Sequence, residues 1–475
     1  GRWVWEQGRR RTASTILRRT SALDFLNLET NSATKKLQTT CAALNASRST
    51  ASLMAIFRFL ISSCVVGSAV PLVTTPTLGY NSWYGLGKAR GWPITNASVI
   101  KATADALVST GLAALGYTTL VVDDSWQAKT YASATAGLQA DPIKFPGGGM
   151  ADVAQYVIGK GLTLGLYTTP GEYTCSGEGT GPDAGRRGSL GHTQANVDLW
   201  VGEWGVGYLK DCVCNTTASL RTHAYRDMRT AIDAVLAGGG GVAKVASVAY
   251  ECDNFMDKPW DSPERTQCNI LSVSDDVPDN FAEWTAGVDL AVAQDAMERT
   301  GGAFAQPSGG RWASFDYLQV GGAQSLAEYR AQMSMFAILA APIFIGTDLR
   351  SIEPEILAVY AAPEVLAVSQ DALTIPGVRL WQETSTGTEA WARDIADKGG
   401  QRRSAVLLLN RSPIAQRIKV VWSALNRSSA SSSSSFSNVT LRDCWARADL
   451  AGVFATHYEA VVPSHEALLL VATSR

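Results

Sequence analysis

Carboxylates that could do chemistry occur at four points of the sequence, close to aromatic residues: Asp123-Asp124, Lys210-Asp211-Cys212, Asp289 and Asp316. An isolated Asp that follows a strand is most often a helix N-cap. Two adjacent Asp followed by Trp126 are harder to explain in that way, because neighbouring like charges cost free energy unless a ligand or a Lys offsets them. Carboxylates with aromatics and no cofactor motif favour glycoside hydrolysis, in which one carboxylate attacks the sugar and another protonates the leaving group.

The sequence gives little support to other chemistries. It has four histidines, none beside a candidate Ser or Cys nucleophile, which argues against Ser–His catalysis and against a His-built metal site. The glycine runs at 147–149 and 238–241 lack the following Lys-Ser/Thr of a phosphate-binding loop, so turns explain them better. The formal net charge of -2 gives no indication of nucleic acid or an anionic membrane as a partner. We therefore expect no cofactor and no metal ion.

The run 208–214, Tyr-Leu-Lys-Asp-Cys-Val-Cys, predicts a buried strand that ends among reactive side chains. Successive residues of a strand point to opposite faces. Lys210, Cys212 and Cys214 therefore share one face, and Asp211 points to the other. The face that meets the substrate decides which of these groups can react.

Apolar runs and helical patterns alternate from Leu78 to about Gly346. Strands are expected at 118–122, 162–167, 206–210, 243–248 and 343–346, and helices at 98–115, 150–159, 194–205, 218–236 and 326–340. This alternation predicts a parallel sheet with crossover helices, and the number of units favours a closed (β/α)8 TIM barrel over residues 70–375. In such a barrel the chemistry lies at the C-terminal ends of the strands, where the carboxylates are expected.

The pattern changes after about Pro376. Strand-like runs joined by polar turns follow at 380–393, 404–409, 418–422, 439–445 and 467–471. They predict a separate C-terminal antiparallel β-sandwich over residues 376–475. The Ser-rich run 428–437 is typical of a flexible loop between two of its strands.

An apolar run begins at Met54, with a basic residue at Arg58, and ends in small residues around Ala69. This arrangement predicts a secretory signal peptide at 54–69, too short to span a bilayer. We expect translation to start at Met54, so that residues 1–53 form an extension that is not part of the mature protein. The mature chain is then expected to have no membrane segment.

Sequons and cysteines also favour the secretory pathway. Candidate N-glycosylation sites begin at Asn96, Asn215, Asn410, Asn426 and Asn438, the one at Asn410 being weakened by the following Pro413. Six of the eight cysteines follow the predicted signal peptide, a number compatible with two disulfides in an oxidising compartment. We expect a secreted protein, or one of a lysosome or vacuole.

Several motifs, in order, resemble glycoside hydrolase family 27, the α-galactosidases and α-N-acetylgalactosaminidases. They are Leu-Gly-Tyr-Asn-Ser-Trp at 78–83, Asp-Asp-Ser-Trp at 123–126, Tyr-Leu-Lys at 208–210, Ala-Ile-Leu-Ala-Ala-Pro at 337–342, Val-Ser-Gln-Asp at 368–371 and Leu-Leu-Asn-Arg at 408–411. The resemblance implies a retaining hydrolase of terminal α-linked galactose-type sugars, with N-acetylgalactosamine as the alternative sugar. The choice between the two sugars is expected to depend on the loop after Tyr250-Glu251-Cys252. Some members dimerise, so a homodimer is a further expectation.

The resemblance also assigns residue roles. Trp83 is expected to pack against the sugar, Asp123 and Asp124 to bind its 4- and 6-hydroxyls, and Tyr167 and Lys210 to line the pocket. Asp289 falls at the acid/base position and Asp316 at a supporting carboxylate. Disulfides are implied between Cys175 and Cys214, beside the site, and between Cys252 and Cys268.

The departures from the family pattern concentrate around the reaction centre. The nucleophile is an Asp two residues after Lys210, a position that holds Cys212 here. Thr285 replaces an Arg expected after Trp284, Ala-Ser-Phe at 313–315 replaces Asn-Asp-Pro, and Ser125 replaces a Cys.

Three interpretations follow from the substituted nucleophile. Asp211 could take over through a shifted strand end, which strand alternation opposes and a bulge could allow. Cys212 could attack instead, although a thioglycoside would be hydrolysed slowly. In the third interpretation the protein keeps the fold, and a sugar-binding or structural role, but hydrolyses little, because loss of a covalent nucleophile costs several orders of magnitude in rate.

Overall fold

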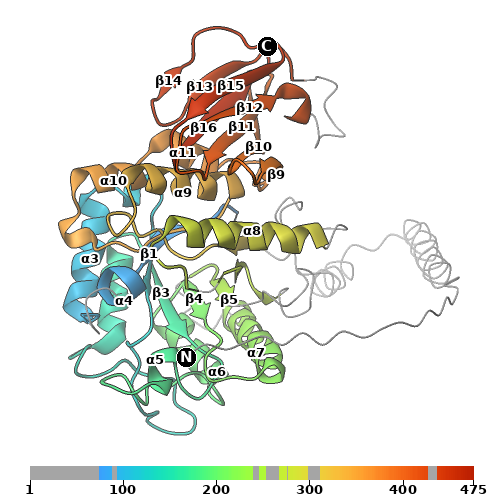
Figure 1. Cartoon of the computed structure of the whole chain (residues 1–475). Coiled ribbons are helices and arrows are strands. Elements are labelled where there is room, and N and C mark those ends of the chain that lie inside the picture. Colours follow the sequence, from blue (N-terminus) through green and yellow to red (C-terminus); the bar gives the residue numbers. More distant parts are fainter. Residues whose placement is uncertain are drawn as a thin grey trace, which may run out of the picture. The chain divides into compact units, whose positions relative to one another are not determined.

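A computed structural model of the chain describes residues 74–87, 94–238, 245–252, 267–274, 276–297, 311–425 and 436–475. Its strands form one eight-stranded parallel sheet, followed by antiparallel sheets of six and two strands (Figure 1). Within these residues no helix has the length and apolar character needed to cross a membrane. The predicted extension at 1–53 and signal peptide at 54–69 lie outside the described residues.

The parallel sheet consists of β1 (Leu78–Asn81), β2 (Thr119–Val122), β3 (Thr163–Thr168), β4 (Tyr208–Asp211), β5 (Ala249–Cys252), β6 (Ile270–Ser272), β7 (Trp312–Ser314) and β8 (Ile343–Ile345). Neighbours in the sheet follow chain order, and β1 also pairs with β8. Leu318, four residues beyond the end of β7, forms a parallel bridge to Ile345 of β8, which joins the two edges. This order confirms the predicted (β/α)8 barrel.

Helices follow the strands along the chain: α3 (Ala97–Ser109), α4 (Gly149–Gly159), α5 (Cys175–Glu178), α6 (Thr193–Val197), α7 (Ala218–Ala237), α8 (Phe281–Met297), α9 (Leu326–Leu339), α10 (Pro354–Tyr360) and α11 (Pro363–Ser369). Local signals begin several of them. The Asn96 side chain accepts a hydrogen bond from Val99 N at the start of α3. Ser325 and Glu328 form a capping box at the start of α9.

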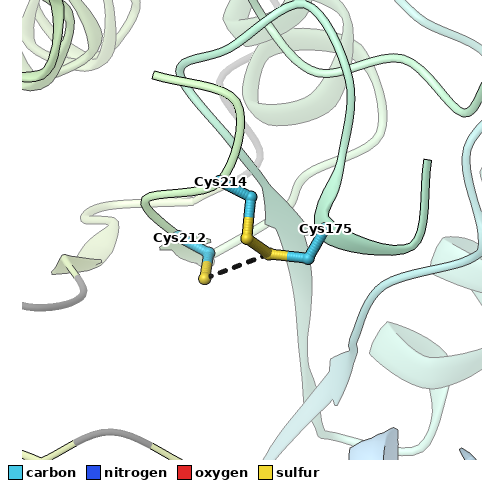
Figure 2. Close-up of side chains that lie close together, drawn as sticks. All are labelled: Cys175, Cys212 and Cys214. Atoms are coloured by element: carbon cyan, nitrogen blue, oxygen red, sulfur yellow. Dashed lines mark hydrogen bonds between the residues drawn. A yellow bond between two sulfur atoms is a disulfide. The ribbon is translucent and has the colours of Figure 1, made fainter. Parts of the chain in front are cut away.

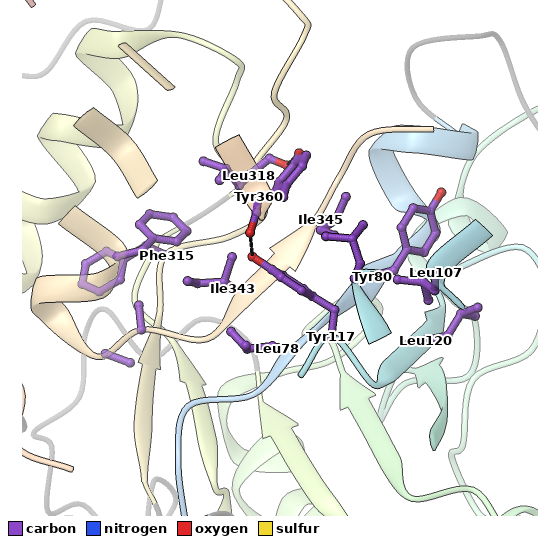
Figure 3. Close-up of a cluster of buried hydrophobic side chains, with 14 of the residues drawn as sticks. Leu78, Tyr80, Leu107, Tyr117, Leu120, Phe315, Leu318, Ile343, Ile345 and Tyr360 are labelled. Atoms are coloured by element: carbon purple, nitrogen blue, oxygen red, sulfur yellow. Dashed lines mark hydrogen bonds between the residues drawn. The ribbon is translucent and has the colours of Figure 1, made fainter. Parts of the chain in front are cut away.

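The barrel core lies between its strands and the surrounding helices (Figure 3). Apolar side chains of β1 and β8, such as Leu78 and Ile343, are almost fully removed from water. Tyr117 is also fully buried, and its hydroxyl donates to Tyr360 O at 2.9 Å, so its polar end has a partner inside the core. Burying these side chains stabilises the barrel by about 2 kcal/mol for each large apolar group.

The C-terminal sheets are built from β9 (Val378–Glu383), β10 (Thr388–Lys398), β11 (Gln401–Asn410), β12 (Gln416–Val421), β13 (Thr440–Asp443), β14 (Ala448–Asp449), β15 (His457–Val462) and β16 (Ala467–Thr473). The larger sheet has the order β14-β13-β16-β11-β10-β9, and β12 pairs with β15. Inward residues such as Val406, Leu408 and Ile418 form a second apolar cluster between the two sheets. This arrangement confirms the predicted C-terminal sandwich.

Arg393 of β10 joins the sandwich to the barrel helices. Its buried guanidinium donates to the carbonyl oxygens of Ala337 at 2.6 Å and Val368 at 2.7 Å, at the ends of α9 and α11. These carbonyls lie in the last turns of their helices, where each also accepts a long backbone hydrogen bond of 3.4 Å, from Ala340 N and Asp371 N respectively. The guanidinium therefore adds a second, charge-assisted donor to each helix end.

The structure corrects two of the expected elements. The strand expected at 243–248 is β5 at Ala249–Cys252, because the buried residues there are Tyr250, Glu251 and Cys252. The single strand expected at 380–393 is the hairpin of β9 and β10, which turns at the left-handed Gly387. Strands β6 and β7 were not predicted, because each has only three residues and ends in Ser, whereas the equally short β8 is wholly apolar.

Candidate active site

A pocket of about 340 Å³ opens at the C-terminal ends of the barrel strands. Most of the residues assigned to the site line it: Trp83, Asp123, Asp124, Tyr167, Cys175, Lys210, Cys212, Cys214 and Asp316. Glu251, Asp276 and Tyr317 also line it. Five carboxylates and a single cationic side chain, that of Lys210, thus face the pocket among its described lining residues. Such a lining disfavours anionic ligands and suits a neutral, hydroxyl-rich molecule.

Asp123 and Asp124 follow β2 directly, and neighbouring residues donate hydrogen bonds to both carboxylates. Asp123 Oδ2 accepts hydrogen bonds from Asn81 Nδ2 at 2.7 Å and Lys210 Nζ at 3.3 Å. Asp124 Oδ2 accepts from Ser176 N at 2.8 Å. Burial raises the pKa of Asp124, and the hydrogen bond from Ser176 opposes this rise. The adjacent pair predicted from sequence therefore lies at the pocket, with Lys210 as the charge that offsets it.

Aromatic rings surround the Lys210 ammonium group. Its Nζ lies 4.9 Å from the centre of the Tyr317 ring and 5.6 Å from that of Tyr167. The backbone N of Trp83 donates to Asn81 Oδ1, which fixes the start of this segment at the pocket wall. The rings provide the flat surfaces on which the C–H face of a sugar can stack.

Asp211 and Cys212 face opposite sides, as strand alternation predicts. Asp211, the last residue of β4, is fully buried outside the pocket lining, and its Oδ2 accepts a hydrogen bond from Tyr250 OH at 2.7 Å. Cys212 lines the pocket and is partly exposed. The structure therefore places a thiol where the resemblance expects a carboxylate, and β4 shows no bulge that would turn Asp211 inward.

Disulfides join Cys175 to Cys214 and Cys252 to Cys268, as the resemblance implied. The first connects the loop after β3 to the loop after β4. Gly171 lets these loops approach, because a Cβ at this position would lie only 2.7 Å from Cys214 O. Cys212 keeps its thiol, and its Sγ lies 3.5 Å from Cys175 Sγ (Figure 2).

Asp316 lies at the pocket in a left-handed backbone conformation, with φ of 67°. Its Oδ2 accepts hydrogen bonds from Tyr84 OH at 2.7 Å and Val277 N at 2.6 Å. Burial raises the pKa of Asp316 to about 7, the Val277 hydrogen bond opposes the rise, and the Asp276 charge adds to it. Asp316 and Asp276 thus interact electrostatically across this side of the pocket.

Asp289 was expected at the pocket, but the structure does not place it among the residues that line the pocket. Asp289 lies on α8, and its carboxylate pairs with Arg379 and with Arg411, the latter at 2.7 Å. Partial burial raises its pKa, but these two guanidinium groups lower it further, to below the ordinary value. Thr285, which the resemblance set beside the reaction centre, lies on the same helix and donates to Phe281 O.

Two carboxylates of the pocket were not assigned from the sequence. Asp276 follows β6, and a signal for it existed in the second Asp-Asp pair, at 275–276, shortly after a short apolar run. Glu251 of β5 is the strand neighbour of Lys210, is buried, and accepts a hydrogen bond from Tyr208 OH. Nothing in its sequence context distinguishes it from a core residue.

One group of side chains among the described residues brings three potential metal ligands close together, namely Cys175, Cys212 and Cys214. Two of these sulfur atoms share a disulfide, so in this state only Cys212 can supply the thiolate that a soft metal ion requires.

The fold and the pocket define the class of protein, a (β/α)8-barrel glycosidase with a C-terminal β-sandwich. Residues 92–371 match the family described as "Alpha galactosidase A", and residues 385–472 match "Alpha galactosidase C-terminal beta sandwich domain". The chain is 32% identical over 400 residues to an "Alpha-galactosidase" of Oryza sativa subsp. japonica, which covers 84% of this chain and 85% of the relative.

Solved structures agree with this assignment. The crystal structure of alpha-galactosidase I from Mortierella vinacea superimposes with a TM-score of 0.71 at 26% identity, covering 84% of this chain and 97% of the other. That of the alpha-galactosidase from Saccharomyces cerevisiae with raffinose gives a TM-score of 0.67 at 20% identity, covering 85% and 98%, and shows the shared fold. The chain belongs to glycoside hydrolase family 27.

Proposed function

We propose that this protein binds a terminal galactose-type sugar in the pocket and hydrolyses its glycosidic bond far more slowly than a retaining α-galactosidase would. One observation carries the proposal. Cys212 lines the pocket at the nucleophile position, while the neighbouring Asp211 is buried on the opposite face and bonded to Tyr250. The pocket thus retains its sugar-binding character and lacks a carboxylate at the place where the covalent bond would form.

The binding half of the proposal rests on groups that suit a neutral sugar. Asp123 and Asp124 present carboxylate oxygens that can accept hydrogen bonds from sugar hydroxyls, and Lys210 can donate. Trp83 and Tyr167 add apolar ring surface to the lining of the same pocket. These are the residues to which the family resemblance gave sugar-binding roles. The loop that was expected to distinguish galactose from N-acetylgalactosamine, after Cys252, lies outside the described residues.

The catalytic half follows from the chemistry of retention. A retaining site needs two carboxyl groups about 5–5.5 Å apart, one to attack the sugar and one to exchange the proton. We propose Asp276 for the proton transfer, because it lines the same pocket as Cys212, whereas the Asp289 carboxylate is held by two Arg. A thiol at position 212 would form a thioglycoside that water cleaves slowly, so little turnover is expected.

The test is hydrolysis of a chromogenic α-galactoside by the wild type and by Cys212→Asp. We expect Cys212→Asp to raise kcat/KM by on the order of 10²–10⁴-fold, because it returns a carboxylate to the reaction centre. Cys212→Ser is the matched control, of similar size and without a carboxylate, and should remain as slow as the wild type. A wild type that already hydrolyses at the rate of Cys212→Asp would contradict the proposal.

Binding is measured separately by titration with galactose. We expect binding by the wild type and its loss in Asp123→Ala, which removes a carboxylate from the sugar-binding wall. Absence of galactose and N-acetylgalactosamine binding in a folded wild type would mean that the protein has kept the fold for another purpose.

A second candidate function is slow hydrolysis with Glu251 as the attacking carboxylate. It is favoured by the place of Glu251 in the pocket lining, one strand from Lys210. Glu251→Gln should abolish whatever activity the wild type has if this candidate is correct. If the activity is unchanged in Glu251→Gln and lost in Cys212→Ser, the thiol is the nucleophile.

We further propose that the protein matures in an oxidising compartment of the secretory pathway. Two disulfides within the barrel support this, since such bonds are rare in the cytosol. The sequon at Asn410 is an unsuitable glycosylation site, because the side chain is buried and its Nδ2 donates to Ile414, Val462 and Pro463 carbonyls. Mass spectrometry of the secreted protein, before and after glycan removal, tests both statements.

A further inference from the structure

Three sulfur atoms lie together on the pocket wall. The Sγ atoms of Cys175, Cys212 and Cys214 are all within 4.8 Å of one another, and that of Cys212 is 3.5 Å from that of Cys175 (Figure 2). All three residues line the pocket and are partly exposed, so small molecules in solvent can reach them. The cluster exists because Cys212 replaces the family carboxylate beside a disulfide that the resemblance also implied.

We propose that Cys212 and the Cys175–Cys214 disulfide form a thiol–disulfide exchange site in the wall of the pocket. The Cys212 thiolate attacks Cys175 Sγ, a Cys175–Cys212 bond forms, and the Cys175–Cys214 bond breaks. The electron pair of the broken bond leaves with Cys214 as a thiolate. The proton lost by Cys212 passes to solvent, and Cys214 later takes one up. One disulfide and one thiol are present before and after, so no oxidant or reductant is required.

The exchange requires a rearrangement of one short loop, because Cys212 Sγ must come into line with the Cys175–Cys214 bond. Cys212 and Cys214 are separated only by Val213, in the loop that leaves β4, so the bond moves between neighbouring points of one loop. The Cys212 backbone N donates to Thr168 O, which holds the start of this loop against β3. The Tyr167 hydroxyl donates to Cys175 Sγ at 2.9 Å, so the sulfur under attack already lies beside a hydrogen-bond donor.

The exchange would alter the sugar site. Bonding Cys212 to Cys175 would draw the side chain at the nucleophile position toward the loop after β3 and present the Cys214 thiol in its place. A sugar that contacts this wall should cover Cys212 and slow the exchange. This coupling, unlike the exchange itself, rests on the proposed sugar-binding function.

The test is disulfide mapping of protein purified without reductant. The protein is alkylated rapidly with N-ethylmaleimide, digested under non-reducing conditions and analysed by mass spectrometry. We expect a Cys175–Cys212 peptide and label on Cys214 in at least about a tenth of the molecules, since the isomers differ by one short loop. Finding only the Cys175–Cys214 disulfide, with label confined to Cys212 and Cys444, would overturn the proposal.

Variants separate exchange from a mixture formed during folding. Cys212→Ser should show the Cys175–Cys214 disulfide alone and no label at either residue. Cys444→Ser removes the other described thiol, which is buried in the sandwich, and should leave the exchange unchanged. Alkylation of the native protein at a low and at a high concentration of N-ethylmaleimide then distinguishes exchange from a fixed mixture. If the isomers interconvert, the more reactive thiol is labelled from both isomers at the low concentration, so the ratio of label on Cys212 to label on Cys214 changes. An identical ratio at both concentrations would overturn exchange in the folded protein.

Saturating galactose then tests the coupling. We expect the labelling of Cys212 to slow by about tenfold, because the thiol is reachable only in the unliganded fraction. Exchange that proceeds equally fast with and without galactose would leave the sulfur chemistry intact and would count against the proposed sugar-binding function.

Discussion

The carboxylate of Asp211 and the hydroxyl of Tyr250 form a 2.7 Å hydrogen bond between adjacent strands, on the side of β4 that faces away from the pocket. Asp211 is fully buried there, and the hydroxyl of Tyr225 lies 3.4 Å from its backbone oxygen. This hydrogen bond holds the Asp211 carboxylate on the side of the strand away from the pocket, where it cannot attack a bound sugar. The substitution at Cys212 is therefore not offset by the neighbouring carboxylate.

Asp211→Asn should weaken the fold and leave function unchanged. Replacing a buried charged acceptor of a tyrosine hydroxyl is expected to lower the free energy of unfolding by about 1–3 kcal/mol. Urea unfolding measures the loss, and galactose titration and α-galactoside hydrolysis measure function. Tyr250→Phe is the matched control, since it removes the same hydrogen bond from the other side. Loss of hydrolysis in a stably folded Asp211→Asn would show that the strand end shifts and that Asp211 is the nucleophile.

Asp276 and Asp289 should behave differently in the Cys212→Asp background. Asp276→Asn should lower kcat by on the order of 10²–10⁴-fold, the range typical of a lost general acid/base. Asp289→Asn should keep kcat within about twofold, because its carboxylate is bonded to Arg379 and Arg411 away from the pocket. Kinetics of the two double variants distinguish the assignments, and the opposite ranking would return the acid/base role to Asp289.

The stability of the protein should depend on pH through Asp316. Its pKa is about 7 in the folded protein, because of burial first and of the Asp276 charge in addition, and the folded state therefore binds a proton more tightly than the unfolded chain. The resulting stabilisation is full below the ordinary Asp pKa of about 4 and is lost as the pH rises through about 7.

Chemical unfolding at pH 5 and pH 8 measures this dependence. Asp316→Asn, which cannot ionise, should show a smaller fall in unfolding free energy over the interval than the wild type. Asp289→Asn is the control, since the lowered pKa of Asp289 puts its own titration below this window. Equal slopes for the wild type and Asp316→Asn would mean that Asp316 is ionised throughout.

Arg411→Met should loosen the contact between barrel and sandwich. Arg411 pairs with Asp289 of α8 at 2.7 Å and with the fully buried Glu389 of β10 at 2.8 Å. Without Arg411, the cationic partner that remains to Glu389 among the described ion pairs is Arg379. We therefore expect the free energy of unfolding to fall by about 3 kcal/mol. Thermal unfolding measures the change, and Arg417→Met, at an exposed ion pair, should change stability by less than about 1 kcal/mol. Similar losses in both variants would contradict a buried network.

Much of the fold could be predicted because the barrel strands are apolar and the helices carry clear boundaries. The pattern of 162–167 became β3, and helix α9 begins at the predicted Leu326, beside its capping box. Short strands were the weak point. Strands β6 and β7 have three residues each and end in Ser, so they show neither a period nor the wholly apolar run that revealed β8. Their positions follow from pairing with neighbouring strands.

The placement of Asp289 shows the same limit at the site. Asp276 comes shortly after a short apolar run and Asp289 directly after Val288, and counting along the chain cannot tell a carboxylate at a strand end from one on a helix. Because β6 was missed, the carboxylate that lines the pocket after it was passed over, and the role was assigned to Asp289 on the following helix. The Arg partners that hold Asp289 come from the sandwich, about 90 and 122 residues further along the chain, so no local pattern could have revealed them.

By itself, the sequence determined the family, the barrel followed by a sandwich, and the two faces of the strand at 208–214. The alternation of side chains along a strand is a local property, so it put Lys210 and Cys212 on one face and Asp211 on the other without further information. Only the tertiary structure decided which face meets the pocket, that Asp276 lies there in place of Asp289, and that three sulfur atoms meet beside it. Each of these depends on loops from different strands converging at one end of the barrel, a convergence set by the packing of the whole sheet.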